Sequence, residues 1–157
     1  MTVRECSLGR GLFADRDYVP GEEILRFEGR TVAASAVAQL GADECYMIQI
    51  GPDLYLEPLP PGRYTNHSCM PNAAICDDVR LIALTAIRSG EQVCFDYSTT
   101  MSEDNWTMDC RCGASNCRGV IRDFSELPAD LQRRYMDLNV VQTFIVDELK
   151  EGLKKRA

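Results

Sequence analysis

Short apolar runs separated by turn residues fill the first hundred positions of the chain. Turn residues such as Gly51-Pro52-Asp53, Asp77-Asp78 and Ser89-Gly90 lie between these runs. This spacing is typical of short strands joined by tight turns, and it predicts a mostly β domain. We expect a short helix in the alanine-rich run at 32–40, a hairpin that joins 45–50 to 54–56, and further strands at 8–14, 24–29, 73–76, 80–87 and 92–97.

The spacing of apolar residues becomes helical near the C-terminus. After Pro128, apolar side chains recur at Leu131, Tyr135 and Leu138, and a second stripe contains residues 141, 144, 145, 149 and 153. A basic end that begins at Lys150 suits the C-terminus of a helix. Such stripes are more often packing faces than binding faces. We therefore expect a C-terminal helical tail over residues 123–157 that packs on the β domain.

A polar stretch at residues 63–72 interrupts the apolar pattern. It reads Arg-Tyr-Thr-Asn-His-Ser-Cys-Met-Pro-Asn and holds His67, the only histidine of the chain. Taken alone, this stretch is a surface turn in which Ser68 and Asn72 bond to nearby backbone. Two later stretches favour a functional site instead: an apolar run that ends in Tyr97, and a cluster of three cysteines.

The cysteine cluster has the spacing of a metal-binding loop, because Cys110, Cys112 and Cys117 lie within eight residues. Structural zinc takes four ligands, so one ligand must come from elsewhere. Cys69 in the polar stretch is the best candidate, since the other cysteines lie in or beside strand-like runs or near the terminus, and His67 is its competitor. Three reduced cysteines without a metal remain the alternative. A fourth ligand at Cys69 would fasten the loop onto the polar stretch.

Charge and composition limit the partners. The formal charge of -7 argues against a surface that neutralises phosphates, so we expect no direct nucleic-acid partner, and a basic lysine-containing peptide fits better. The first residues lack a secretory signal, and no run approaches the ~18 apolar residues of a membrane span. Only three of eight cysteines cluster, which fits a reducing compartment. We expect a soluble intracellular protein without a membrane partner, cytoplasmic, or nuclear if the source is a eukaryote.

Three ordered motifs resemble those of one enzyme family. Residues 66–72 match the signature Asn-His-Ser-Cys-x-Pro-Asn, residues 90–97 resemble its Gly-Glu to Asp-Tyr signature, and residues 110–117 are similar to the Cys-x-Cys-x4-Cys zinc loop. An early Gly-x-Gly at residues 9–11 is similar to the family's as well. On these motifs the chain resembles the SET-domain protein-lysine methyltransferases that carry a post-SET zinc loop.

The resemblance implies several small β-sheets around a threaded, knot-like core in which Asn66, His67 and Tyr97 meet. It implies a SET domain at 1–100, a post-SET zinc loop at 101–122 and the helical tail at 123–157. S-adenosylmethionine would be the methyl donor and S-adenosylhomocysteine the product. The implied cofactor-binding residues are Gly9, Arg10, Gly11, Leu12, Tyr46, Arg63, Asn66, His67 and Tyr97, and the implied zinc ligands are Cys69, Cys110, Cys112 and Cys117.

The resemblance also implies transfer of methyl groups to a lysine of a basic protein or peptide, such as a histone tail. Tyr97 would be the essential hydroxyl, with Tyr46 bordering the site. Phe95, two residues earlier, resembles a position that sets how many methyl groups are added, and a phenylalanine there favours di- or trimethylation. The alternative is a non-catalytic SET-fold module that binds peptide, against which the intact Asn66, His67 and Tyr97 argue.

Overall fold

The computed structural model describes residues 1–37, 39–104 and 106–154. Within that part of the chain, twelve short strands form five small sheets. The strands are β1 (Thr2–Cys6), β2 (Gly9–Phe13), β3 (Glu23–Arg26), β4 (Gly29–Ala33), β5 (Ile48–Gly51), β6 (Leu54–Pro58), β7 (Asn66–His67), β8 (Ala73–Cys76), β9 (Arg80–Ala83), β10 (Cys94–Phe95), β11 (Thr107–Asp109) and β12 (Val120–Arg122).

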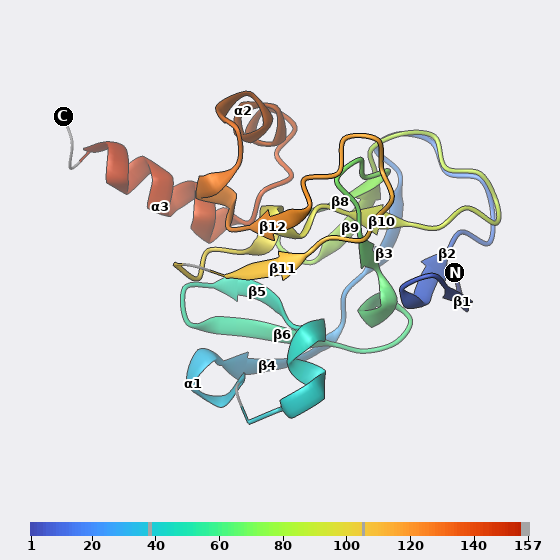
Figure 1. Ribbon diagram of the computed structural model, residues 1–157, viewed down its shortest axis with the longest axis horizontal. Helices are drawn as coiled ribbons and strands as arrows, with labels where there is room; N and C mark the ends of the chain where they lie inside the picture. The colour runs from blue at the N-terminus through green and yellow to red at the C-terminus, as the bar shows by residue number, and fades with distance from the viewer. Residues whose placement is uncertain (38, 105, 155–157) are drawn as a thin grey trace.

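Helical segments are short until the C-terminus. The α-helices are α1 (Ala34–Val37), α2 (Ala129–Asp137) and α3 (Thr143–Lys154), and the 3-10 turns are η1 (Gly41–Tyr46), η2 (Gly62–Tyr64), η3 (Tyr97–Thr100) and η4 (Phe124–Glu126). In Figure 1, α2 and α3 lie on one side of the molecule and the sheet of β4, β6 and β5 lies on the other, with β11 and β12 between them. No described helix is both long and apolar enough to cross a membrane.

Local hairpins account for part of the pairing. Strands β1 and β2 are antiparallel, as are β8 and β9, whose turn places Asp77 and Asp78 at φ values of 47° and 65°. Aspartate tolerates this left-handed conformation, which suits the tight hairpin turn that the sequence predicts. Other pairs are distant in sequence: β3 adds to β9, and β4 adds to β6.

Two buried clusters hold the fold together. The larger lies between the early sheets and includes Leu12, Ile75, Leu81 and Phe95. A second cluster joins the C-terminal helices to the β domain by packing Tyr135 and Ile145 with Phe124 and Ala74. The side chain of Asp78 accepts a hydrogen bond from the backbone N–H of Thr143 at 2.9 Å, which satisfies a donor in the first turn of α3. Most described residues of the apolar stripes near the C-terminus therefore pack, as the sequence predicts, whereas Leu138 is exposed.

Several predicted boundaries differ from the structure. The helix expected at 32–40 is four residues long, because Val32 and Ala33 pair with Tyr55 and Leu54 in the β4–β6 ladder; residue 38 lies outside the described residues. The strand expected at 45–50 begins only at Ile48, since residues 45 and 46 belong to η1. Residues 155–157 of the predicted tail also lie outside the described part.

Candidate functional site

A short parallel ladder brings the polar stretch and the tyrosine motif together. Strand β7 pairs with β10 so that Asn66 lies opposite Cys94 and His67 opposite Phe95. Beyond the ladder, the Ser68 N–H donates to the Phe95 carbonyl at 3.0 Å. The chain continues from Phe95 to Tyr97, whose ring centre lies 5.3 Å from that of His67. Residues from the two motifs therefore share one site, as the resemblance implies.

The glycine-containing strand β2 forms one edge of this site. The amide of Asn66 donates to the Arg10 carbonyl at 2.9 Å and so ties β2 to β7. Gly9 has a φ of +95°, a conformation that favours glycine, and both Gly9 and Arg10 are exposed. Gly11 is buried, and Leu12 is fully buried in the core. The accessible part of the predicted cofactor strand is therefore its first two residues.

Aromatic and cationic side chains continue this edge. The guanidinium of Arg63 stacks over the ring of Tyr46 at 4.1 Å from its centre. The guanidinium of Arg10 donates to the Tyr64 hydroxyl at 2.9 Å, and the rings of Tyr46 and Tyr64 meet edge to face at 6.1 Å. Tyr64, which sequence reasoning did not select, thus links Arg10 to Tyr46.

A cavity of about 200 Å³ lies beside this edge and is lined by Tyr97, Phe95, Tyr46 and Arg63. Phe95 is buried, with its ring centre 4.9 Å from that of Tyr97 and 6.4 Å from that of Phe27. Most of the remaining lining is apolar, so a side chain that enters the cavity loses contact with water. Sequence reasoning did not predict several of the lining residues, among them Cys45, Tyr55, Met101, Glu103 and Trp106.

The hydroxyl of Tyr97 is anchored beside this cavity. It donates to the Thr65 carbonyl at 2.9 Å. Burial raises the pKa of Tyr97 well above its ordinary value, since the interior disfavours a phenolate. The phenol therefore stays protonated at neutral pH, and it can orient a reactant but does not act as a phenolate base.

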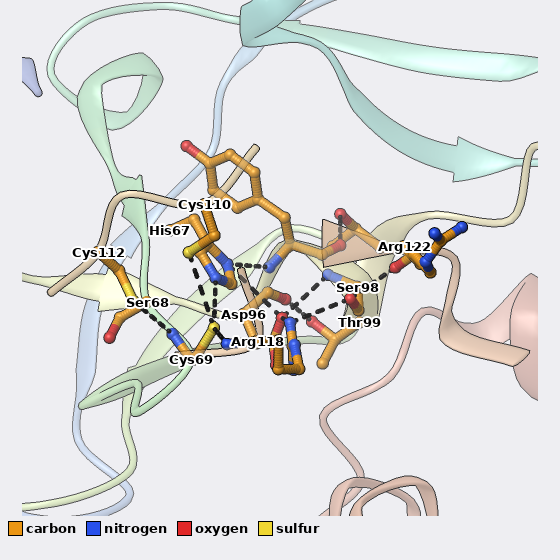
Figure 2. Close-up of polar contacts among 12 residues, drawn as sticks. His67, Ser68, Cys69, Asp96, Ser98, Thr99, Cys110, Cys112, Arg118 and Arg122 are labelled. Carbon is orange, nitrogen blue, oxygen red and sulfur yellow. Dashed lines mark hydrogen bonds and ion pairs between the residues drawn. The ribbon is translucent and has the colours of Figure 1, made fainter. Parts of the chain in front are cut away.

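The side chains of four residues form one cluster (Figure 2), namely His67, Cys69, Cys110 and Cys112. Their ligand atoms all lie within 4.8 Å of one another, and the two sulfurs of Cys69 and Cys110 are 3.7 Å apart. Two thiolates of a tetrahedral zinc site, each about 2.3 Å from the metal, would be separated by about 3.8 Å. The donor set and its spacing therefore fit zinc.

Hydrogen bonds around His67 favour a supporting role for its ring. The backbone N–H of Tyr97 donates to Nδ1 at 3.2 Å, so Nδ1 carries the lone pair and the neutral ring holds its proton on Nε2. Burial lowers the pKa of His67 to about 4, which keeps the ring neutral at pH 7. Nε2 lies 3.3 Å from the sulfur of Cys69 and can donate to it. A protonated nitrogen cannot bind a metal, so His67 supports Cys69 in this tautomer.

The cluster contains His67 in place of the predicted ligand Cys117, which lies at its edge. Cys117 is exposed, and its sulfur lies 3.9 Å from the Cys110 carbonyl oxygen. Burial by itself would raise the pKa of Cys112, but backbone N–H donors from Cys69 and Ala114, with the neighbouring thiols of Cys110 and Cys117, lower it to about 6. One thiol of the cluster therefore ionises readily, as a metal ligand must.

Sequence reasoning missed a polar group behind the site. The buried carboxylate of Asp96, next to Tyr97, receives hydrogen bonds from Arg118 and Tyr135. Two signals for this group were present, because Asp96 belongs to the Asp-Tyr motif and Arg118 directly follows Cys117. Nothing in the helical stripe distinguished Tyr135 from a packing residue.

Comparisons with known proteins agree with this geometry. Residues 9–98 match the family model described as SET domain. Over 130 residues the chain is 29% identical to Histone-lysine N-methyltransferase set-2 of Caenorhabditis elegans, covering 72% of this chain and 8% of that protein. It is 30% identical over 127 residues to Histone-lysine N-methyltransferase trr of Drosophila melanogaster, covering 70% and 5%. The chain thus spans less than a tenth of these relatives.

A solved structure has a similar fold. It is described as KRYPTONITE in complex with mCHH DNA, H3(1-15) peptide and SAH, and it matches with a TM-score of 0.59 and 22% identity. The match covers 76% of this chain and 29% of that one. The predicted mostly β fold with C-terminal helices is therefore confirmed.

Proposed function

Since this chain belongs to the SET-domain family, we propose that it is an S-adenosylmethionine-dependent protein-lysine N-methyltransferase. Its substrate is a lysine in a basic protein or peptide such as a histone tail. The observation that carries the proposal is the pairing of β7 with β10, which brings Asn66 and His67 close to Tyr97 at the wall of the cavity, although the two segments are about thirty residues apart.

The edge built by β2, Tyr46, Arg63 and the Asn66-His67 ladder would hold the cofactor. When bound, S-adenosylmethionine supplies an electrophilic methyl group on a positively charged sulfur. The exposed Gly9 and Arg10 and the guanidinium of Arg63 offer polar contacts along this edge. Asn66 keeps β2 in register with the ladder through its bond to the Arg10 carbonyl.

The cavity prepares the lysine by removing water from its amine. A free lysine has a pKa near ~10.4, and burial disfavours the ammonium form by up to ~3–5 pKa units. Glu103 is the only carboxylate among the described residues that line the cavity, and it accepts a hydrogen bond from Tyr55. The amine therefore loses its proton to solvent before transfer, and Tyr97 orients it.

Cys69, Cys110, Cys112 and Cys117 would hold zinc, with the His67 ring as a donor to Cys69. The 3.7 Å separation of the Cys69 and Cys110 sulfurs and the tautomer of His67 support this ligand set. Bound there, zinc would fasten the cysteine loop that follows β11 to the end of β7. Trp106 and Met108, which line the cavity just before this loop, would thereby depend on the metal.

Two observations support a basic substrate. The chain is acidic overall, with a formal charge of -7, and two curated relatives are named histone-lysine N-methyltransferases. A histone substrate would place the protein in the nucleus of a eukaryote. Because Phe95 presents no hydroxyl to the cavity, we infer di- or trimethylation.

Labelled methyl transfer tests this function. The purified chain is incubated with labelled S-adenosylmethionine and either histones or fractionated lysate, and labelled bands are analysed by mass spectrometry. We expect methylated lysine in a basic protein. Heat stabilisation by S-adenosylmethionine without transfer to any fraction would instead indicate a module that binds cofactor but does not turn over.

A further inference from the structure

The carboxylate of Asp96 is a buried junction directly behind the catalytic tyrosine. Its side chain has no exposed surface. Arg118 donates to both oxygens, at 2.6 and 2.7 Å, and the Ser98 N–H donates to Oδ1 at 3.1 Å. Figure 2 shows Asp96, Arg118 and Ser98 meeting on one side of the cysteine cluster. This junction determines the course of the backbone on both sides of Tyr97.

The fourth donor to this carboxylate comes from the C-terminal helices. The hydroxyl of Tyr135, on α2, donates to Oδ2 at 3.0 Å, and the Tyr135 side chain is itself buried. A carboxylate has about four lone-pair sites, and here each oxygen of Asp96 accepts two hydrogen bonds. Loss of the Tyr135 hydroxyl would leave Oδ2 with Arg118 alone.

Arg118 extends the junction to the cysteine cluster. Its backbone N–H donates to the sulfur of Cys69 at 3.3 Å, and it directly follows Cys117. A displacement of the Asp96 carboxylate would therefore move the guanidinium of Arg118 and the loop that carries Cys117. One polar group on α2 is thus connected both to Tyr97 and to the cysteine cluster.

We propose that Tyr135 is a positioning residue for methyl transfer: its hydroxyl fixes the carboxylate of Asp96, and through it Tyr97 and the cysteine loop. Helix α2 is then a functional part of the catalytic unit and does more than cover the second apolar cluster. The expected effect on methyl transfer rests on the proposed function. The coupling of Tyr135 to Asp96 and Arg118 can be measured without turnover.

The test uses the full chain with Tyr135→Phe, which keeps the buried ring and removes only the hydroxyl. We expect kcat to fall about tenfold, with KM for S-adenosylmethionine and for peptide within about twofold, because small misplacements at a reacting centre cost up to ~100-fold in rate. By amide hydrogen exchange, the N–H groups of Ser98 and Arg118 should exchange about tenfold faster.

Tyr18→Phe is the matched control. Tyr18 is a buried tyrosine whose hydroxyl contacts Asp15 at 3.2 Å, and it does not line the cavity. Tyr18→Phe should lower the melting temperature by about as much as Tyr135→Phe does. It should leave kcat and the amide exchange rates of Ser98 and Arg118 unchanged. The positioning role of Tyr135 is overturned if Tyr135→Phe behaves like this control. It is also overturned if Tyr135→Phe fails to fold, since Tyr135 would then serve stability alone.

The outcome for the proposed function is separate. If the wild-type chain transfers no methyl group to any substrate, the methyltransferase proposal fails, and the exchange rates of Ser98 and Arg118 still decide whether Tyr135 holds this junction. If the wild type is active but neither kcat nor exchange responds to Tyr135→Phe, the positioning role fails and the methyltransferase proposal stands.

Discussion

Replacing Phe95 by tyrosine tests how the cavity sets the number of methyl groups. Phe95 is 3% exposed and its ring centre lies 4.9 Å from that of Tyr97, so a hydroxyl on this ring would reach the region where the amine is expected. Such a hydroxyl can hold a water beside the amine. That water takes up part of a cavity of about 200 Å³, space that a methylated amine would otherwise use.

The size of the shift follows from the cost of that water. An ordered water changes the free energy by ~0–2 kcal/mol, and ~1.4 kcal/mol is tenfold in a rate ratio. Phe95→Tyr should therefore raise the ratio of monomethyl to higher products by up to about 30-fold, while the first transfer remains. Mass spectrometry of a peptide substrate over time gives this ratio directly.

Phe144→Tyr on α3 is a suitable control, since it adds a hydroxyl to a half-buried phenylalanine outside the cavity. It should leave the product ratio unchanged. The reasoning fails if the wild type stops at monomethyl-lysine on a good substrate, or if Phe95→Tyr yields the wild-type mixture.

Three further variants test the site. Cys110→Ser should lower both thermal stability and cofactor affinity, because the cysteine loop directly follows β11, which carries part of the cavity wall. Metal analysis by native mass spectrometry should find one zinc in the wild type, and a metal-free chain with full activity would refute the site. Asn66→Ala should weaken S-adenosylmethionine binding by about 2–13-fold, because it removes a hydrogen bond to the Arg10 carbonyl worth ~0.5–1.5 kcal/mol, and calorimetry that finds unchanged affinity would contradict the pocket. Tyr97→Phe should abolish turnover while calorimetric cofactor affinity stays within about threefold, since it leaves the protein fold intact and removes only the bond to Thr65.

Local elements of the fold were predictable because their signals lie within a few residues. The hairpin of β8 and β9 follows from two apolar runs around Asp77 and Asp78, and α2 follows from a stripe after Pro128. Pairing between distant strands was not predictable from pattern. Strand β7 is only two residues long, too short for any periodicity, yet its parallel pairing with β10 creates the site.

Tertiary contacts overrode local preference at the start of the short helix expected within 32–40, which the structure has at Ala34–Val37. Alanine favours helix, but Val32 and Ala33 extend β4 because Tyr55 and Leu54 on β6 offer ladder partners. Similarly, Leu12 was expected along the cofactor, and its side chain instead fills the core. A strand alternates its faces, so a motif of consecutive residues cannot place every side chain toward one ligand.

The residues of the candidate site that lie within the sequence motifs were predictable. Spacing alone selected Cys69 over the other single cysteines, and the structure brings it within 3.7 Å of Cys110. The contribution of Tyr135 depends on a hydrogen bond to Asp96, which is 39 residues away. No spacing rule connects them, because only the folded chain sets that contact.

Methyl transfer to a defined lysine peptide tests the central proposal most directly. The wild-type chain and Tyr97→Phe are incubated with S-adenosylmethionine and a histone H3 tail peptide or core histones, and the products are read by mass spectrometry. We predict methylated lysine with the wild type and none with Tyr97→Phe, although both bind the cofactor. Two results would contradict the proposal. One is methylation by Tyr97→Phe at the wild-type rate. The other is no methylation by a wild type that binds S-adenosylmethionine and is offered histones and fractionated lysate.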